Sequence, residues 1–234
     1  MMQAMVKQWW HELIRDKNSF YMTCALAMTF VGFFAWKGYQ WHVERRERSA
    51  QLAMSEALDE YYKAFDANAL ASKVLSEDSE EVIGQRIDDA RIALESIISR
   101  HGNSNLAPYA HAFDADVAWF AGDKDRAFTS MQRAVDRATV PSVRNLFSAK
   151  YALMLIDGGD VQKGLDLLHT LAHDPKNSVA DYAAYYLGYY HWSKGDSQAA
   201  RDAWGVLESF KSDARPEGSS PWLAAAQRKL SLLS

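Results

Sequence analysis

The feature that most constrains the fold of this chain is a Gly-Asp pair that recurs at nearly constant spacing. The three copies lie 37 and 36 residues apart, and a fixed period between about 20 and 50 residues is typical of stacked repeat proteins. Side-chain size recurs too, with a tiny residue five positions after each glycine and a large apolar one nine positions after it. The pairs are Gly122-Asp123, Gly159-Asp160 and Gly195-Asp196; the tiny residues are Ala127, Gly164 and Ala200; the large ones are Met131, Leu168 and Trp204.

The segments on both sides of each glycine have the period of an α-helix. Tyrosines recur at three- and four-residue steps from Tyr182 to Tyr190, and apolar residues do so from Ala199 to Leu207. A glycine can adopt the left-handed conformation that ends a helix. The aspartate after it can cap the next helix by accepting from a backbone N–H. Each unit is therefore predicted to be a helical hairpin that crosses at the tiny residue, and the fold class is all-α.

The repeat unit resembles a tetratricopeptide repeat, although it is two or three residues longer than the usual 34. The first hairpin lacks the Gly-Asp pair in its turn, at 76–79. The predicted fold is a tetratricopeptide-repeat-like α-solenoid of about four hairpins, closed by a C-terminal capping helix. The hairpins are expected at about 44–100, 108–141, 145–176 and 181–212, and the cap at 221–233.

An uncharged segment, Ser19 to Trp36, precedes the repeats. Its 18 residues would span roughly 27 Å as a helix, close to the hydrocarbon thickness of a bilayer, and aromatic residues flank both of its ends. We expect 19–36 to be a single transmembrane helix in contact with the lipid bilayer, 1–18 an N-terminal segment with a possible interfacial helix, and 37–234 the repeat domain.

The apolar segment has two alternative interpretations. A buried core helix would need a second large core, which the rest of the chain does not offer. A cleaved signal peptide would need small residues after the apolar run, where this chain has bulky aromatic residues. Three basic residues before the segment and four after it leave its orientation open.

The charge of residues 37–234 argues against a nucleic-acid partner. This part of the chain carries 23 of the 26 basic and 28 of the 30 acidic residues, a net charge of −5, without a basic stripe. The one cysteine, Cys24, lies in the N-terminal apolar segment. The repeat domain therefore cannot have a disulfide framework.

The sequence contains no recognisable catalytic or cofactor-binding motif. His169 and His173 have a spacing that can hold a metal, but the segment lacks the glutamate of a His-Glu-x-x-His motif, so we expect solvated histidines. The acid pairs Asp88/Asp89 and Asp114/Asp116 are expected on solvated faces or at helix caps. We expect no enzyme activity, cofactor, metal or small-molecule substrate; an enzyme using the two histidines is a distant alternative.

An aromatic groove is expected where the first helix of each hairpin lines the inner side of the stack. Such a surface suits extended or unfolded polypeptide, because tyrosine and tryptophan offer large contact area at low entropic cost. Alternatively, the 44–75 helix or the capping helix covers these residues, or they form core between hairpins. The candidate protein-binding residues are Tyr109, Trp119, Phe120, Tyr182, Tyr185, Tyr189 and Trp192.

Four short motifs occur in a distinctive order along the chain: Val6-Lys7-Gln8-Trp9-Trp10, WKGYQW over 36–41, SKGDSQAARDAW over 193–204 and QRKLSLLS over 227–234. In order and spacing they resemble the YfgM family of bacterial inner-membrane proteins, the ancillary subunits of the Sec translocon. The likeness covers nearly the whole chain. The sequence departs from that family in its longer, charged stretch at 76–81 and in its many aromatic residues.

The resemblance implies a location and partners that the residues alone do not. It implies a single-pass inner-membrane protein with its N-terminus in the cytoplasm and its repeats in the periplasm. It also implies association with SecYEG and a membrane-bound periplasmic chaperone, and it brings no catalytic residues. The alternative function is a structural component of another bacterial envelope complex, such as a secretion or motility machine.

Overall fold

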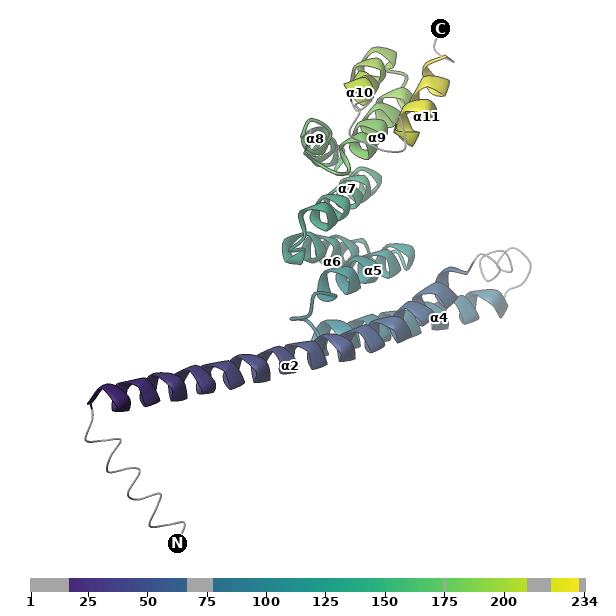
Figure 1. Ribbon diagram of the computed structural model, residues 1–234. Helices are drawn as coiled ribbons and strands as arrows, with labels where there is room; N and C mark the ends of the chain where they lie inside the picture. The colour runs from purple at the N-terminus through teal and green to yellow at the C-terminus, as the bar shows by residue number, and fades with distance from the viewer. Residues whose placement is uncertain (1–16, 67–77, 175, 210–219, 232–234) are drawn as a thin grey trace. The chain divides into compact units, whose positions relative to one another are not determined.

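The computed structural model describes residues 17–66, 78–174, 176–209 and 220–231, with side chains described from residue 28 onward except at 78–81 and 209. All regular structure in these ranges is helical (Figure 1). The prediction of an all-α repeat fold is therefore confirmed. The helices are α2 (Lys17–Phe65), α4 (Asp78–Arg100), α5 (Ala107–Phe120), α6 (Lys124–Arg137), α7 (Pro141–Gly158), α8 (Val161–Ala172), α9 (Ala180–Ser193), α10 (Ser197–Ser209) and α11 (Pro221–Leu230).

Two compact units divide the chain, Met1–Ser49 and Ala50–Ser234. In the described part of the first unit, α2 carries apolar side chains that are exposed around the helix, including Met28, Phe33 and Trp36. The predicted N-terminal segment at 1–18 lies almost entirely outside the described residues. In the second unit, residues 76–77 of the turn predicted at 76–79 lie outside the described residues. Residues 78–79 belong to α4, which begins at Asp78.

The predicted transmembrane helix needs correction. Among the described residues, none of the helices combines the length and the apolar character needed to span a bilayer. Residues 19–27 lie outside the part whose side chains are described. The prediction of a bilayer-spanning helix at 19–36 is therefore wrong.

The three Gly-Asp pairs form the turns within the hairpins. Gly122, Gly159 and Gly195 have φ angles of +83°, +106° and +80°, a left-handed conformation that favours glycine. The Asp123 carboxylate accepts from the Arg126 backbone N–H at 3.1 Å, and the Asp196 carboxylate caps α10 in the same way. Asp160 stands at the start of α8 without a side-chain cap bond.

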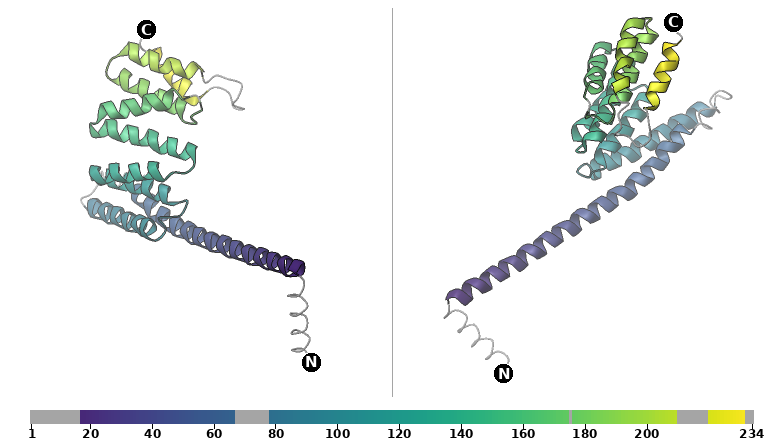
Figure 2. Two further views of the ribbon diagram at one scale, coloured as in Figure 1. Left: turned by 90° about the vertical axis from the view of Figure 1, so that its left-hand side faces the viewer. Right: turned by 45° about the horizontal axis from the view of Figure 1, so that its top comes forward.

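The helices of the second unit stack in chain order (Figure 2). Within the three regular hairpins, α5 packs on α6, α7 on α8, and α9 on α10, and each pair contacts the next. Before them, the end of α2 joins α4 and α5 in one apolar cluster that buries Met54, Leu94 and Val117. A continuous series of small cores therefore holds the stack together, as in other solenoid folds.

Small residues occupy the helix crossings and large ones fill the spaces between hairpins. Ala127 and Ala200 are fully buried, as are Met131 and Leu168. At Gly164, an added Cβ would lie 2.6 Å from the Ala152 carbonyl oxygen, so α7 and α8 approach too closely there for any side chain. The crossing of α7 and α8 therefore requires glycine where the other two hairpins have alanine.

Candidate functional site

The three candidate residues on α5 contact different neighbours. Tyr109 packs edge-on against Phe147 of α7, with ring centroids 5.5 Å apart. Trp119 packs against Phe128 of α6 at 5.8 Å, and the Lys124 ammonium lies 5.7 Å from its ring. Phe120 of α5 is 39% exposed and its ring lies 5.0 Å from that of Phe65 at the end of α2. These residues do not form one continuous surface, because each belongs to a different helix contact.

The candidate residues at the start of α9 are covered by α11. The Trp222 ring of α11 lies 5.3 Å from the Tyr182 ring and 4.9 Å from the Tyr185 ring, and it also packs on Tyr186. Burial, with Tyr186 beside it, raises the pKa of the Tyr182 hydroxyl to about 12. These tyrosines serve as the packing surface for the capping helix.

The candidate residues at the end of α9 lie beneath a lysine of α11. The Lys229 ammonium is 4.8 Å from the Tyr189 ring and 4.2 Å from the Trp192 ring, within the range of a cation–π interaction. At the start of α11, the buried Ser220 hydroxyl donates to the Asp181 carboxylate of α9 at 2.7 Å. The sequence does not predict the contact of Lys229 with Tyr189 and Trp192, because these residues are far apart along the chain and no local pattern links them.

A cleft of about 420 Å³ lies between α7 and α9, beside this covered cluster. Its wall is apolar and aromatic, and an acidic and a basic residue stand at its edge. Tyr189 alone among the candidate residues belongs to it, and this residue is 40% exposed. The residues lining the cleft are Leu153, Ile156, Asp157, Val161, Tyr186, Tyr189, Tyr190, Ser193 and Lys194. Its volume is within the range of ligand-binding sites in proteins.

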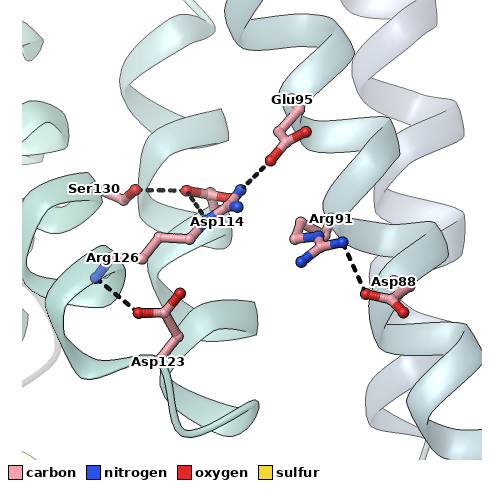
Figure 3. A network of polar contacts seen from close by, with 7 residues as sticks. All are labelled: Asp88, Arg91, Glu95, Asp114, Asp123, Arg126 and Ser130. Carbon is pink, nitrogen blue, oxygen red and sulfur yellow. Dashed lines mark hydrogen bonds and ion pairs between the residues drawn. The ribbon is translucent and has the colours of Figure 1, made fainter.

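A polar network joins α4, α5 and α6 on another part of the stack (Figure 3). The Asp114 carboxylate of α5 is almost fully buried and receives the Arg126 guanidinium at 2.5 Å and the Ser130 hydroxyl at 2.5 Å. Arg126 also reaches Glu95 of α4 at 2.7 Å. The hydrogen bonds to Asp114 raise the pKa of the Arg126 guanidinium. The expectation of a solvated or capping Asp114 is wrong.

The repeat itself contains a signal for this network. One period after Asp114 and Arg126 stand Tyr151 and Lys163, and that lysine ammonium lies 5.8 Å from the tyrosine ring. In the last hairpin, the residue equivalent to Asp114 is Leu187. A buried carboxylate thus occupies a position where the other hairpins have large side chains that pack, and the fold does not require a charge there.

The two histidines considered as metal ligands stack on each other. The ring centroids of His169 and His173 are 4.1 Å apart, and His173 Nδ1 lies 2.9 Å from the His169 carbonyl oxygen. No group of three or more His, Cys, Asp or Glu side chains suited to hold a metal occurs in the described ranges. The pair is explained by its contacts within α8.

Comparison with known proteins agrees with the architecture. The family model described as the tetratricopeptide repeat-like domain matches residues 7–216. No curated protein matches the chain significantly. Repeat stacks of this kind act as scaffolds for protein–protein interaction through their extended surfaces. Because the match covers most of the sequence, the chain belongs to the tetratricopeptide repeat-like domain family.

Proposed function

We propose that this protein is a docking scaffold for polypeptide segments and that the cleft between α7 and α9 is its main contact surface. The observation that carries the proposal is the cleft itself, an opening of about 420 Å³ walled by tyrosine and aliphatic side chains within a repeat stack. Aromatic side chains at such a surface supply most of the contact energy, because they bury large areas with few rotatable bonds.

The cleft is better suited to this role than the other aromatic groups. Tyr182 and Tyr185 are already packed under Trp222, whereas Tyr189, which contacts only Lys229 of α11, is 40% exposed. Asp157 and Lys194 stand at the edge of the cleft, both exposed. An extended segment with an apolar or aromatic anchor and flanking polar residues fits this arrangement of an apolar centre and a charged rim.

We propose further that the scaffold acts in bacterial protein export, on the periplasmic side of the Sec translocon, with SecYEG and a periplasmic chaperone as partners. The support is the ordered likeness to the YfgM family, in particular the segment 193–204, which includes the turn and first part of α10. The cleft would then receive newly exported chains or a segment of the chaperone.

Site-specific photo-crosslinking in cells tests both parts of the proposal. Tyr189 and Tyr190 are replaced singly by a benzoylphenylalanine, which keeps an aromatic ring at the edge of the cleft. Tyr62 on α2, 63% exposed and outside the cleft, is the matched control. We expect discrete polypeptide adducts from the two cleft positions and none of these from the control, with translocon or chaperone subunits among them.

The possible results separate the general proposal from the specific one. Adducts at the cleft positions that contain only subunits of another envelope complex would support the docking role and reject the translocon. Identical adducts from Tyr189, Tyr190 and Tyr62 would reject the cleft as the docking surface.

A further inference from the structure

The two walls of the α7–α9 cleft carry charges of opposite sign. On the α7 wall, the exposed Asp157 lines the cleft from the last turn of the helix, and Asp160 follows at the start of α8. On the α9 wall, Lys194 lines the cleft directly after the helix. The ammonium of Lys229 lies 4.8 Å from the ring of Tyr189, which also lines the cleft. The cleft therefore separates an acidic wall from a basic wall.

These charges do not neutralise one another. Asp157 and Asp160 form no hydrogen bond or ion pair with the described part of the chain. The two lysines lie over aromatic rings instead of pairing with carboxylates, and the Lys194 ammonium is 5.6 Å from the Tyr190 ring. Both walls thus have charges that a bound group can neutralise.

Neighbouring charges of the contrary sign are engaged elsewhere. On the acidic side, the Lys163 ammonium of α8 lies 5.8 Å from the ring of Tyr151, which does not line the cleft. On the basic side, the Asp196 carboxylate accepts from the backbone N–H of Ala199 at 3.0 Å and caps α10. The difference in sign between the walls is therefore not cancelled locally.

The repeat fold does not require an acidic residue at position 157. The residues two positions before the turn glycine are Phe120 and Ser193 in the other two hairpins. A carboxylate in the last turn of a helix is also unfavourable, because the free carbonyl groups there carry partial negative charge. Asp157 therefore contributes nothing evident to α7, and its place in the cleft points to a role in binding.

We propose that the cleft selects polypeptide segments in which a basic and an acidic residue flank the apolar anchor, the basic one at Asp157 and the acidic one at Lys194. This inference rests on the docking role proposed above and adds a sequence preference to it. Charge complementarity across an interface determines partner choice more than it determines raw affinity.

An extended segment can present all three side chains to the cleft at once. Successive side chains of such a segment point to opposite sides, so residues two positions before and two after the anchor point the same way as the anchor. These two residues lie roughly 13 Å apart along the segment. The favoured segment therefore has its opposite charges at these two positions.

Fluorescence anisotropy of labelled peptides with the full chain tests this preference. All peptides have one leucine as anchor. The charged positions, two before and two after it, hold lysine and glutamate in either order, two lysines, two glutamates or two glutamines. One exposed ion pair strengthens an interaction by up to about fivefold. We expect a mixed-charge peptide to bind at least about threefold tighter than the other three kinds.

Variants of the two walls should change the preference in opposite ways. Asp157→Lys makes both walls basic and should favour the peptide with two glutamates. Lys194→Asp makes both walls acidic and should favour the peptide with two lysines. Glu56→Lys on α2 and Arg201→Asp on α10, both at exposed positions outside the cleft, change the net charge equally. These controls should keep the preference for mixed charge.

The results separate this inference from the docking role. Equal affinities for all peptides, tightest binding of a peptide with like charges, or a preference that both wall variants leave unchanged would overturn the inference. The docking role would still stand if Tyr189→Ala/Tyr190→Ala weakened that binding. Absence of binding by every peptide, or binding that the aromatic double variant leaves unchanged, would reject the docking role of the cleft itself.

Discussion

At the scale of single residues, contact distance decides which side chains the helix crossings accept. Gly164 is the sharpest case, because an added Cβ would meet both the Ala152 carbonyl oxygen and the Ile156 side chain at 2.6 Å. Gly205, also within a helix, has no atom within 4 Å of the same added atom. Position 164 therefore excludes a side chain and position 205 accepts one, although both lie in the second helix of a hairpin.

The substitutions Gly164→Ala and Gly205→Ala should change stability in opposite directions. Gly164→Ala forces backbone apart and is expected to lower the free energy of unfolding by roughly 1–3 kcal/mol. Gly205→Ala restricts the unfolded chain and adds helix propensity, so it should raise stability by about 0.4–1 kcal/mol. Urea unfolding followed by circular dichroism measures both; a stabilising effect of Gly164→Ala would contradict the close crossing.

The buried carboxylate at Asp114 should be costly to remove by itself. Asp114→Ala leaves Arg126 and Ser130 without their common acceptor and is expected to destabilise the fold by roughly 3 kcal/mol. The triple variant Asp114→Leu/Arg126→Ala/Ser130→Ala copies the equivalent residues of the last hairpin. Because no buried polar group of the network is then left unpaired, and Glu95 is exposed to solvent, it should regain most of that loss in urea unfolding. A triple variant as unstable as Asp114→Ala would show that the network is needed for packing.

His111 should make stability depend on pH below neutrality. Its pKa is lowered in the folded state, so the unfolded chain takes up the proton first, near the ordinary value of about 6.5. Stability is then present above that pH and falls as the pH decreases toward the folded pKa. Unfolding at pH 7.5 and 5.5 should show a smaller loss in His111→Gln than in the wild type. The exposed His42→Gln is the control, and a loss that is equal in all three proteins would contradict this assignment.

At the scale of elements, α11 behaves as the lid of the last hairpin. Ser220 fixes its start to Asp181 by a 2.7 Å hydrogen bond, and the same hydroxyl caps the helix by accepting from the Trp222 backbone N–H. Trp222 then packs on the α9 tyrosines, and Leu223 and Ala226 are buried. Solenoid ends need such a cover, because the outer face of the last repeat would otherwise be exposed.

Trp222→Ala should loosen the end of the stack more than its middle. Losing a large, partly buried aromatic ring is expected to cost about 3 kcal/mol, and local opening of α9 to α11 should follow because repeats contact only their neighbours. Hydrogen exchange should accelerate in α9 and α10 while α5 and α6 change little. Uniform acceleration across all hairpins would mean that the stack unfolds as one cooperative unit.

At the scale of the whole molecule, the sequence predicts the features that repeat and misses those that do not. Small residues such as Ala127 and Ala200 recur every 36 or 37 residues, so three copies identify the hairpins and their crossings. Asp114 and Lys229 occur once each, and their contacts join residues far apart in the chain. Periodicity carries no information about such contacts. The aligned repeats show only that Asp114 stands where the other hairpins have the large side chains of Tyr151 and Leu187.

Two further predictions concern the transmembrane helix at 19–36 and the aromatic groove. The transmembrane prediction rested on the length of the uncharged segment 19–36, whereas none of the helices in the described ranges has the length and apolar character needed to cross a bilayer. For the predicted aromatic groove, the sequence left open whether the capping helix covers the residues of α9. Tyr182 and Tyr185 lie under Trp222, Tyr189 and Tyr190 line the cleft, and Tyr186 does both, because α11 packs on α9.

The central claim is that the α7–α9 cleft binds polypeptide, and equilibrium binding tests it most directly. The probe is an unfolded polypeptide, reduced and carboxymethylated so that it cannot refold, and binding is followed by fluorescence anisotropy with the full chain. Removing two aromatic contacts in Tyr189→Ala/Tyr190→Ala should weaken binding by at least about tenfold. Tyr62→Ala should bind as tightly as the wild type. Equal affinities of the double variant and the wild type, with circular dichroism showing both folded, would contradict the account.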